Sequence, residues 1–146
     1  MRIVNGRAFK DYQILERFEA GIVLTGAEIK SIRAGRIKLD QSFARIVGRE
    51  LFLINASIPS WTGEAKFGYN PQRTRKLLLH RAQINHLIGK TQGTKLTTVP
   101  LSVYIKKNLA KVEIALTRPK RKFEKKEALK RRDIARETER ELRGKV

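Results

Sequence analysis

Most of the first 117 residues alternate between apolar and polar positions in short runs, a pattern that predicts strands. The clearest run is Ala110–Thr117, where three apolar residues share one face and Lys111 and Glu113 point to the other. Tyr12–Thr25 holds two β-rich runs, and their interruption at Glu19–Gly21 predicts a bend or a bulge. The apolar face of the Ala110–Thr117 strand is expected in the core and consists of Val112, Ile114 and Leu116.

Two pairs of runs are separated by turn residues and are predicted to form hairpins. Gly48-Arg49 joins Ser42–Val47 to Glu50–Asn55 in a tight turn. Lys107–Leu109 joins Leu96–Lys106 to the alternating run that follows it. In the first hairpin we expect four apolar residues to face the core, namely Phe43, Ile46, Phe52 and Ile54.

Two segments follow the period of a helix instead. Gly26–Arg33 places Ile29 and Ile32 on one face and is expected to end at Gly35. Arg81–Lys90 has Ile84, Leu87 and Ile88 at helical spacing, with Gly89 expected to cap its end. The stretch Ile58–Pro71 follows neither period and is predicted to be an irregular loop.

About six antiparallel strands with about three short helices favour a mainly β fold, a small closed barrel of the oligonucleotide-binding type. Closure of the sheet removes exposed strand edges. A flat α+β sheet with helices on one side is the alternative, and composition does not separate the two. We expect the barrel domain to span residues 1–117 and a basic C-terminal tail to span residues 118–146.

The tail carries 13 Lys and Arg against six Asp and Glu, and its few apolar residues are scattered. A segment that buries so little apolar surface does not offset its ordering entropy, so we expect it to be disordered alone. It also contains helix formers and ion pairs at helical spacing, such as Glu127–Arg131 and Glu139–Arg143. We therefore expect it to become a helix when it binds a polyanion.

The whole chain has 33 Lys and Arg against 14 Asp and Glu, a net charge of +19 that both segments share. This imbalance favours an anionic partner, and nucleic acid is preferred over a membrane because no apolar run is long enough to span one. The absence of Cys and the presence of two His argue against structural zinc, so no metal or cofactor is expected. The N-terminus lacks the apolar region of an export signal, which predicts a cytoplasmic protein.

The first candidate contact to RNA is the cluster Arg73–Lys76, whose three cations and available backbone N–H groups suit phosphates. The alternative to a phosphate contact is a solvated loop with ordinary surface charge. His80 can stack on or hydrogen-bond to a base, and Glu19 can accept from a base edge or a 2′-hydroxyl or simply pair with a cation. Lys30 lies with Arg33 on the charged side of the first long helix, where Glu28 is expected to make an ordinary surface pair. No constellation of a nuclease or other enzyme is present in the sequence.

Several collinear motifs resemble the family of small protein B, the bacterial transfer-messenger RNA-binding protein. They cover the chain from about residue 5 into the tail. The opening motifs are FEAGIVL at 18–24 and EIKSIRAG at 28–35; the central ones are RTRKLLL at 73–79 and VPL at 99–101; the last is KVEI at 111–114, followed by a basic tail.

This resemblance implies an oligonucleotide-binding barrel that holds the tRNA-like part of transfer-messenger RNA. With elongation factor Tu, members of the family deliver that RNA to stalled ribosomes, where the nascent peptide is tagged in trans-translation. Positions that match the family's RNA contacts are Glu19, Leu78, His80 and Lys111, beside the Arg73, Arg75 and Lys76 cluster.

The resemblance also implies that the tail enters the empty decoding centre and message channel of the ribosome and folds there. In this chain the family's Gly-Lys-Lys is replaced by Pro119-Lys120-Arg121, and its Asp-Lys-Arg by Glu124-Lys125-Lys126. Pro119 stiffens the exit from the last strand, and Lys126 lacks the bidentate guanidinium group of Arg. The rivals are a structural ribosomal or rRNA-binding protein and, more weakly, a ribonuclease. The tail residues expected to contact the ribosome are Lys120, Arg121, Glu124, Lys125, Lys126, Lys130, Arg131 and Arg132.

Overall fold

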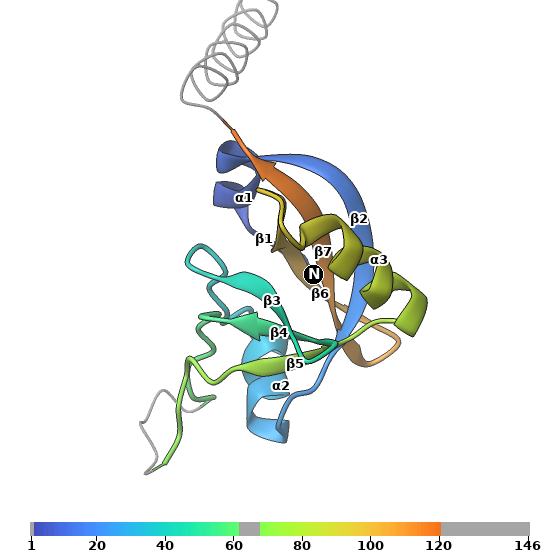
Figure 1. The fold of residues 1–146 in the computed structure, drawn as a ribbon. Helices are drawn as coiled ribbons and strands as arrows, with labels where there is room; N and C mark the ends of the chain where they lie inside the picture. Colours follow the sequence, from blue (N-terminus) through green and yellow to red (C-terminus); the bar gives the residue numbers. More distant parts are fainter. Residues whose placement is uncertain (1, 62–67, 121–146) are drawn as a thin grey trace, which may run out of the picture.

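The computed structural model describes residues 2–61 and 68–120, which form seven strands and three helices (Figure 1). The strands are β1 (Arg2–Val4), β2 (Tyr12–Ile22), β3 (Phe43–Val47), β4 (Glu50–Ile54), β5 (Arg75–Leu78), β6 (Thr97–Lys106) and β7 (Leu109–Pro119). The helices are α1 (Gly6–Asp11), α2 (Gly26–Arg33) and α3 (Arg81–Thr91).

The strands form one antiparallel sheet that closes on itself. Its order is β1-β6-β3-β4-β5-β2-β7, and β7 pairs again with β6. Six strands therefore make a closed ring, and β1 adds to the edge of β6 at Ser102–Tyr104, away from the single β3 bridge at Thr98. The prediction of a small closed antiparallel structure is confirmed, and the flat sheet is not formed (Figure 1).

Both predicted hairpins form around two-residue turns. Gly48 and Arg49 have φ of 57° and 68°, and Lys107 and Asn108 have φ of 51° and 65°. Two consecutive residues with positive φ match the right-handed twist of the strands on either side. The second turn is one residue shorter than predicted, because Leu109 already belongs to β7.

The predicted core face of the first hairpin is wrong in part. Ala44, Leu51 and Leu53 are buried, whereas Phe43 is 36% exposed and pairs with Ile54 on the outer side. Of the four predicted core residues, Ile46 alone packs against the main cluster. Phe43 and Ile46 are three positions apart, so a strand directs their side chains to opposite faces.

The break predicted in β2 lies elsewhere. The register with β7 shifts between Ile14 and Glu16, whereas Glu19–Gly21 pairs regularly with 111–113. At Gly21 the strand has a neighbour on each side, Lys111 of β7 and Leu78 of β5. The interruption at Glu19–Gly21 in the sequence therefore coincides with the point at which β2 gains β5 as a second partner strand.

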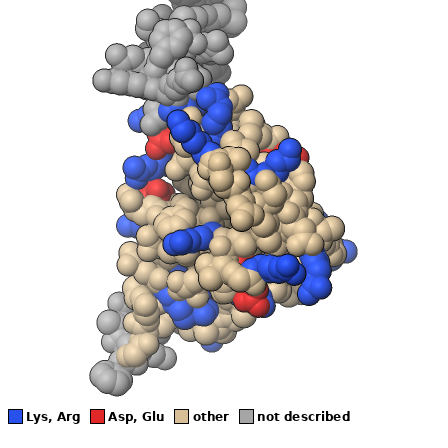
Figure 2. Space-filling model, in the orientation of Figure 1, with Lys and Arg blue, Asp and Glu red and all other residues tan. Residues whose placement is uncertain are grey.

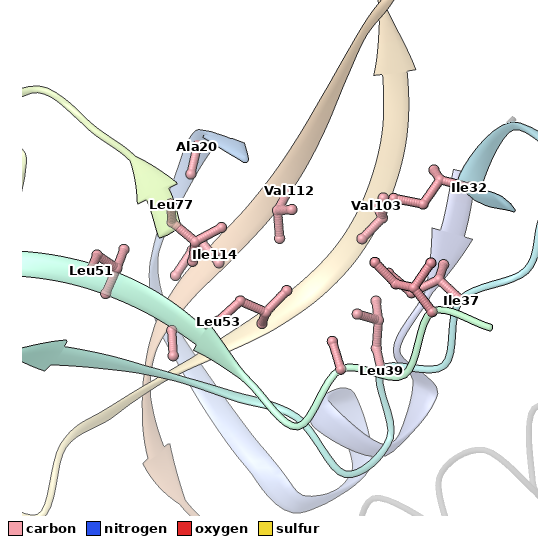
Figure 3. Packing of buried hydrophobic residues seen from close by; sticks show 13 residues of the cluster. Ala20, Ile32, Ile37, Leu39, Leu51, Leu53, Leu77, Val103, Val112 and Ile114 are labelled. Carbon is pink, nitrogen blue, oxygen red and sulfur yellow. The ribbon is translucent and has the colours of Figure 1, made fainter. Parts of the chain in front are cut away.

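The interior of the ring holds the main hydrophobic cluster (Figure 3). The inward faces of β2, β4, β5, β6 and β7 meet there with Ile32 of α2. Val112, Ile114 and Leu116 of β7 are buried, as predicted. A smaller cluster lies under α1, where Ala8 packs with Ala115 on the other face of β7.

Local sequence sets the helix ends. Thr25 and Glu28 form a capping box at the start of α2, and Gly35, with φ of 76°, follows its end as predicted. Helix α3 runs past Gly89 to Thr91, so Gly89 is not its cap. The described parts of 58–71 belong to no strand or helix, in agreement with the predicted loop.

Candidate RNA-binding surface

The outward side chains of β1, β2, β5, β6 and β7 form one surface, which we call the strand face. Because side chains alternate along a strand, burial of Ala20 and Val112 directs their neighbours Glu19 and Lys111 outward. The strand face consists of Arg2, Arg17, Glu19, Gly21, Leu78, Tyr104, Lys106, Lys111 and Glu113.

Glu19 is the acidic centre of the strand face. The Tyr104 hydroxyl donates a hydrogen bond to its Oε2, and the Lys106 ammonium lies 3.3 Å from its Oε1. The hydrogen bond from Tyr104, more than the nearby Lys106 and Lys111, holds the pKa of Glu19 below its usual range. Burial and the same hydrogen bond raise the pKa of Tyr104 to about 12. Glu19 is therefore an ionised acceptor beside a permanent donor.

A second group of charges lies beside it. Glu113 accepts from Arg2 and Arg17, each at 3.1 Å. The Arg2 guanidinium also lies 4.4 Å from the centre of the Tyr104 ring and 3.3 Å from the Ser102 hydroxyl. These contacts link β1, β2, β6 and β7. They also fix the ring of Tyr104, whose hydroxyl holds Glu19.

Leu78 extends the strand face onto β5 with an exposed apolar side chain. It is 50% exposed and lies against Gly21, where an added Cβ would be 3.4 Å from the Leu78 Cβ. The register also places Gly21 opposite Lys111. Three of the four residues that the family resemblance singles out, Glu19, Leu78 and Lys111, thus lie together.

The fourth, His80, follows β5 and is the N-cap of α3. It is exposed, and its backbone N–H donates to Gln83 Oε1 at 3.2 Å. The helix is anchored on β2 by His86, whose Nε2 lies 2.7 Å from Glu16 Oε2. His80 therefore borders the strand face at the end of β5, with its imidazole accessible.

The basic cluster of 73–76 is divided by the alternation of β5. Lys76 points outward and lies 3.3 Å from Glu50 of the neighbouring strand. Arg73 is partly exposed, and its Nη2 lies 2.6 Å from Glu28 Oε1. Lys76 and Arg73 remain accessible to an anion, whereas Arg75 does not.

Arg75 does not fit the predicted phosphate contact, because its side chain is fully buried. Its Nε and Nη2 donate to Glu28 Oε2 at 2.7 and 2.6 Å. The remaining donors reach the carbonyl oxygens of Ala56 at 2.7 Å and Pro71 at 3.0 Å. Every branch of the guanidinium is thus used inside the protein, and we assign Arg75 a structural role.

The interpretation of Glu28 as an ordinary surface pair is wrong. The residue is 1% exposed and closes the capping box of α2 through the Thr25 N–H. Burial alone would raise the pKa of Glu28, but hydrogen bonds from Arg73, Thr25 and Arg75 outweigh it and keep the pKa below its usual value. Glu28 thereby joins α2 to β5 and to the loop before it.

The other predicted site residues lie apart from the strand face. Lys30 is exposed on α2. Lys120 follows β7, where its backbone N–H donates to Asp11 at 2.9 Å and its Nζ to the Phe9 carbonyl at 3.2 Å. The predicted helix and ribosome contacts of 121–146 lie outside the described residues, as do Arg121, Glu124, Lys125, Lys126, Lys130, Arg131 and Arg132.

Lys and Arg are visible over much of one face of the molecule, including the end where β7 leaves it, with few Asp and Glu among them (Figure 2). Among residues 2–61 and 68–120, no three His, Asp or Glu gather as metal ligands would. In the same part of the chain, none of the three helices has the length and apolar character needed to cross a bilayer. Lys and Arg thus outnumber Asp and Glu on this face (Figure 2).

Sequence reasoning missed six contributors to the strand face: Arg2, Arg17, Gly21, Tyr104, Lys106 and Glu113. The hairpin between β6 and β7 pairs Tyr104 with Lys111, so the alternation rule could have placed it outward beside a predicted site residue. No sequence signal could have found Arg2, because its strand joins β6 across about 100 residues.

Comparison with known proteins decides the family. The model of the SmpB protein family matches residues 2–144. The chain belongs to the SmpB family. It is 51% identical over 142 residues to the SsrA-binding protein of Sulfurihydrogenibium sp. (strain YO3AOP1), covering 97% of this chain and 93% of that one. The SsrA-binding protein of Shouchella clausii is also 51% identical, with coverage of 97% and 91%.

A solved structure of the same family has the same fold. A chain from "tmRNA-SmpB: a journey to the center of the bacterial ribosome" superposes with a TM-score of 0.70 at 42% identity. The match covers 88% of this chain and 94% of that chain. Similarity over almost the full length of both SmpB chains confirms the resemblance noted in the sequence.

Proposed function

We propose that this SmpB-family chain is an RNA-binding factor of trans-translation. It binds the tRNA-like part of transfer-messenger RNA (tmRNA) and, with elongation factor Tu, delivers it to stalled ribosomes in the cytoplasm. Similarity to a chain solved with tmRNA and the bacterial ribosome supports this function most directly. The outward cations and accessible apolar residue of the strand face supply the chemistry that a folded RNA requires.

In this proposal the strand face recognises the shape of the RNA. Lys111 meets phosphates, together with Lys76 two residues before Leu78 on β5, and Leu78 offers an apolar surface to an unstacked base. Glu19 accepts from donors on bases or sugars, because its carboxylate is ionised and exposed. His80 adds a stacking or hydrogen-bonding group beside them.

The tail performs a separate task in the proposal: it occupies a message channel that holds no RNA. Helix formation there is favoured because rRNA phosphates neutralise the positive side chains. Attachment of Lys120 to Asp11 and Phe9 fixes the point at which the tail leaves the barrel. Recognition of tmRNA and sensing of the ribosome thus belong to different segments.

No chemical step is assigned to the protein itself. On the strand face, Glu113 is held by Arg2 and Arg17, and Glu19 is held by Lys106 and by the Tyr104 hydroxyl. Its role is to bind and deliver, so intact RNA after prolonged incubation with the purified protein is expected.

Capture of the full-length protein from a bacterial lysate, with sequencing of the bound RNA, tests the proposed function. We expect tmRNA to dominate the captured RNA. A broad mixture of cellular RNA without a preferred species would contradict the proposal. Sedimentation with ribosomes at constant stoichiometry, whatever the state of translation, would instead favour the structural ribosomal protein.

A further inference from the structure

Gly21 forms a flat, partly exposed strip of backbone in the middle of the strand face. Its neighbours are Leu78 on one side and Lys111 on the other, and Glu19 lies two residues before it on the same face. Leu78 lies against Gly21, and its Cβ is 3.4 Å from the position that a Gly21 Cβ would take. An apolar surface, a cation and a carboxylate therefore surround one flat area.

Such an arrangement suits one unpaired nucleotide. An unstacked base packs its face on apolar or aromatic side chains and offers its Watson–Crick edge for hydrogen bonding. The distance from Gly21 to Glu19 is two strand residues, about 7 Å. A base over Gly21 and Leu78 can thus direct its edge toward Glu19 while its phosphate meets Lys111.

The carboxylate of Glu19 selects among the bases. A carboxylate has about four acceptor positions on its two oxygens. Tyr104 takes one on Oε2, and the Lys106 ammonium lies 3.3 Å from Oε1 and 3.5 Å from Oε2. If Lys106 gives up its longer contact and keeps Oε1, each oxygen can accept once more. Guanine alone carries two adjacent donors on its Watson–Crick edge, N1–H and the N2 amino group, so it matches two parallel acceptors.

We propose that Glu19 reads the Watson–Crick edge of one unpaired guanine, whose ring lies on Gly21 and Leu78, and that Tyr104 is the positioning residue for this contact. The inference rests on the proposed function and adds the base that the strand face selects. Tyr104 suits this role because its ring is held by Arg2 at 4.4 Å and its hydroxyl bonds directly to Glu19. The carboxylate then meets the RNA already ionised and oriented.

Inosine substitution tests the recognition of guanine. Inosine keeps N1–H but lacks the N2 amino group, so it removes one of the two donors. Full-length protein is titrated with the tRNA-like half of a bacterial tmRNA, in which each unpaired guanine is replaced by inosine in turn. One replacement should weaken binding about tenfold or more, the effect of losing a hydrogen bond to a charged acceptor. With Glu19→Gln, the same replacement should change affinity by less than about threefold.

Tyr104→Phe tests the positioning role, because it removes the hydroxyl and keeps the ring under Arg2. The variant should bind the guanine RNA less tightly and discriminate less between guanine and inosine. Tyr69→Phe is the matched control: it also loses one hydroxyl hydrogen bond, 2.6 Å to Ile58, on a loop away from the strand face. The control should keep full discrimination at a similar melting temperature.

Gly21→Ala tests the flat surface. Its backbone is not in a strained region and the added methyl group would be in ordinary contact with Leu78, so the substitution acts by filling the area on which the base lies. We expect weaker RNA binding with the fold retained, whereas Gly6→Ala, which has open space around it, should bind normally.

The outcomes separate the two proposals. If the wild type fails to prefer the tRNA-like RNA over an unrelated RNA of equal length, the proposed function itself fails. If it binds that RNA tightly and no inosine replacement weakens binding, the guanine assignment is wrong. If Tyr104→Phe discriminates as well as the wild type, Tyr104 does not position Glu19.

Discussion

Neighbouring cationic residues have opposite roles in this protein. Lys76 and Arg75 are neighbours on β5, yet one faces solvent and the other is fully buried. Burial of Arg75 is possible because Glu28 and two carbonyl oxygens receive its donors. A buried guanidinium in such a network holds elements together, whereas an exposed ammonium is free to meet a phosphate.

Removal of the buried cation is therefore expected to reduce stability. Arg75→Ala leaves Glu28 buried with Arg73 as its remaining ionic partner and should lower the free energy of unfolding by about 3–5 kcal/mol. Urea unfolding followed by circular dichroism measures this change. Arg73→Ala is the control; its side chain is partly exposed, and we expect a loss of about 1 kcal/mol. Equal losses in the two variants would show that Arg75 has no special structural role.

The sequence could not reveal which cation is buried. Arg73 and Arg75 have the same parity along the chain, so alternation alone treats them alike. Both pair with Glu28, more than 40 residues earlier; what separates them is the carbonyl oxygens of Ala56 and Pro71, which accept the remaining donors of Arg75. By contrast, Glu19 and Lys111 could be placed on an outward face because each neighbours an apolar residue that must be buried.

At the scale of elements, turns were easier to predict than faces or partners. Gly48-Arg49 predicts its hairpin because few other sequences adopt two positive φ angles in succession. Phe43 was misplaced because the outer face of β3 also carries apolar residues, so hydrophobicity does not identify the core side. Strand β1 and helix α1 were not predicted at all, since three- and six-residue elements are too short to show a period.

The end of β7 determines where the tail can be removed without damage. The strand continues to Pro119, which pairs with Tyr12, and Lys120 bonds to Asp11. Truncation after Lys120 should therefore leave tmRNA affinity within about threefold of the full chain and abolish peptide tagging on stalled ribosomes. Truncation after Thr117 should in addition lower stability, because it removes paired strand residues. Loss of tmRNA binding on truncation after Lys120 would contradict the division of tasks.

At the scale of the whole molecule, ring closure explains how so small a protein presents a continuous binding surface. Because β6 pairs with β7, strands β5, β2, β7 and β6 lie side by side in this order (Figure 1). Their outward side chains therefore belong to one surface. The inward side chains of the same strands form the core (Figure 3). The strand face is therefore rigid, since each of its residues alternates with one that is packed inside.

Excess positive charge acts over the whole surface, so affinity alone does not locate the RNA. A net charge of +19 attracts any polyanion, and such binding weakens steeply with salt. Residues in direct contact with phosphates differ from the others in one respect: each removed contact lowers the slope of log affinity against log salt by about 1. This slope separates a binding face from general attraction.

The most direct test of the account is the affinity of Lys111→Ala for the tRNA-like half of tmRNA, measured by filter binding over a range of salt concentrations beside Lys38→Ala. Both variants remove one positive charge, but Lys38 lies on the connection between α2 and β3, away from the strand face. We predict that Lys111→Ala binds about tenfold more weakly at moderate salt, with a slope reduced by about 1, and that Lys38→Ala matches the wild type. Equal behaviour of the two variants would contradict the assignment of the strand face as the RNA-binding surface.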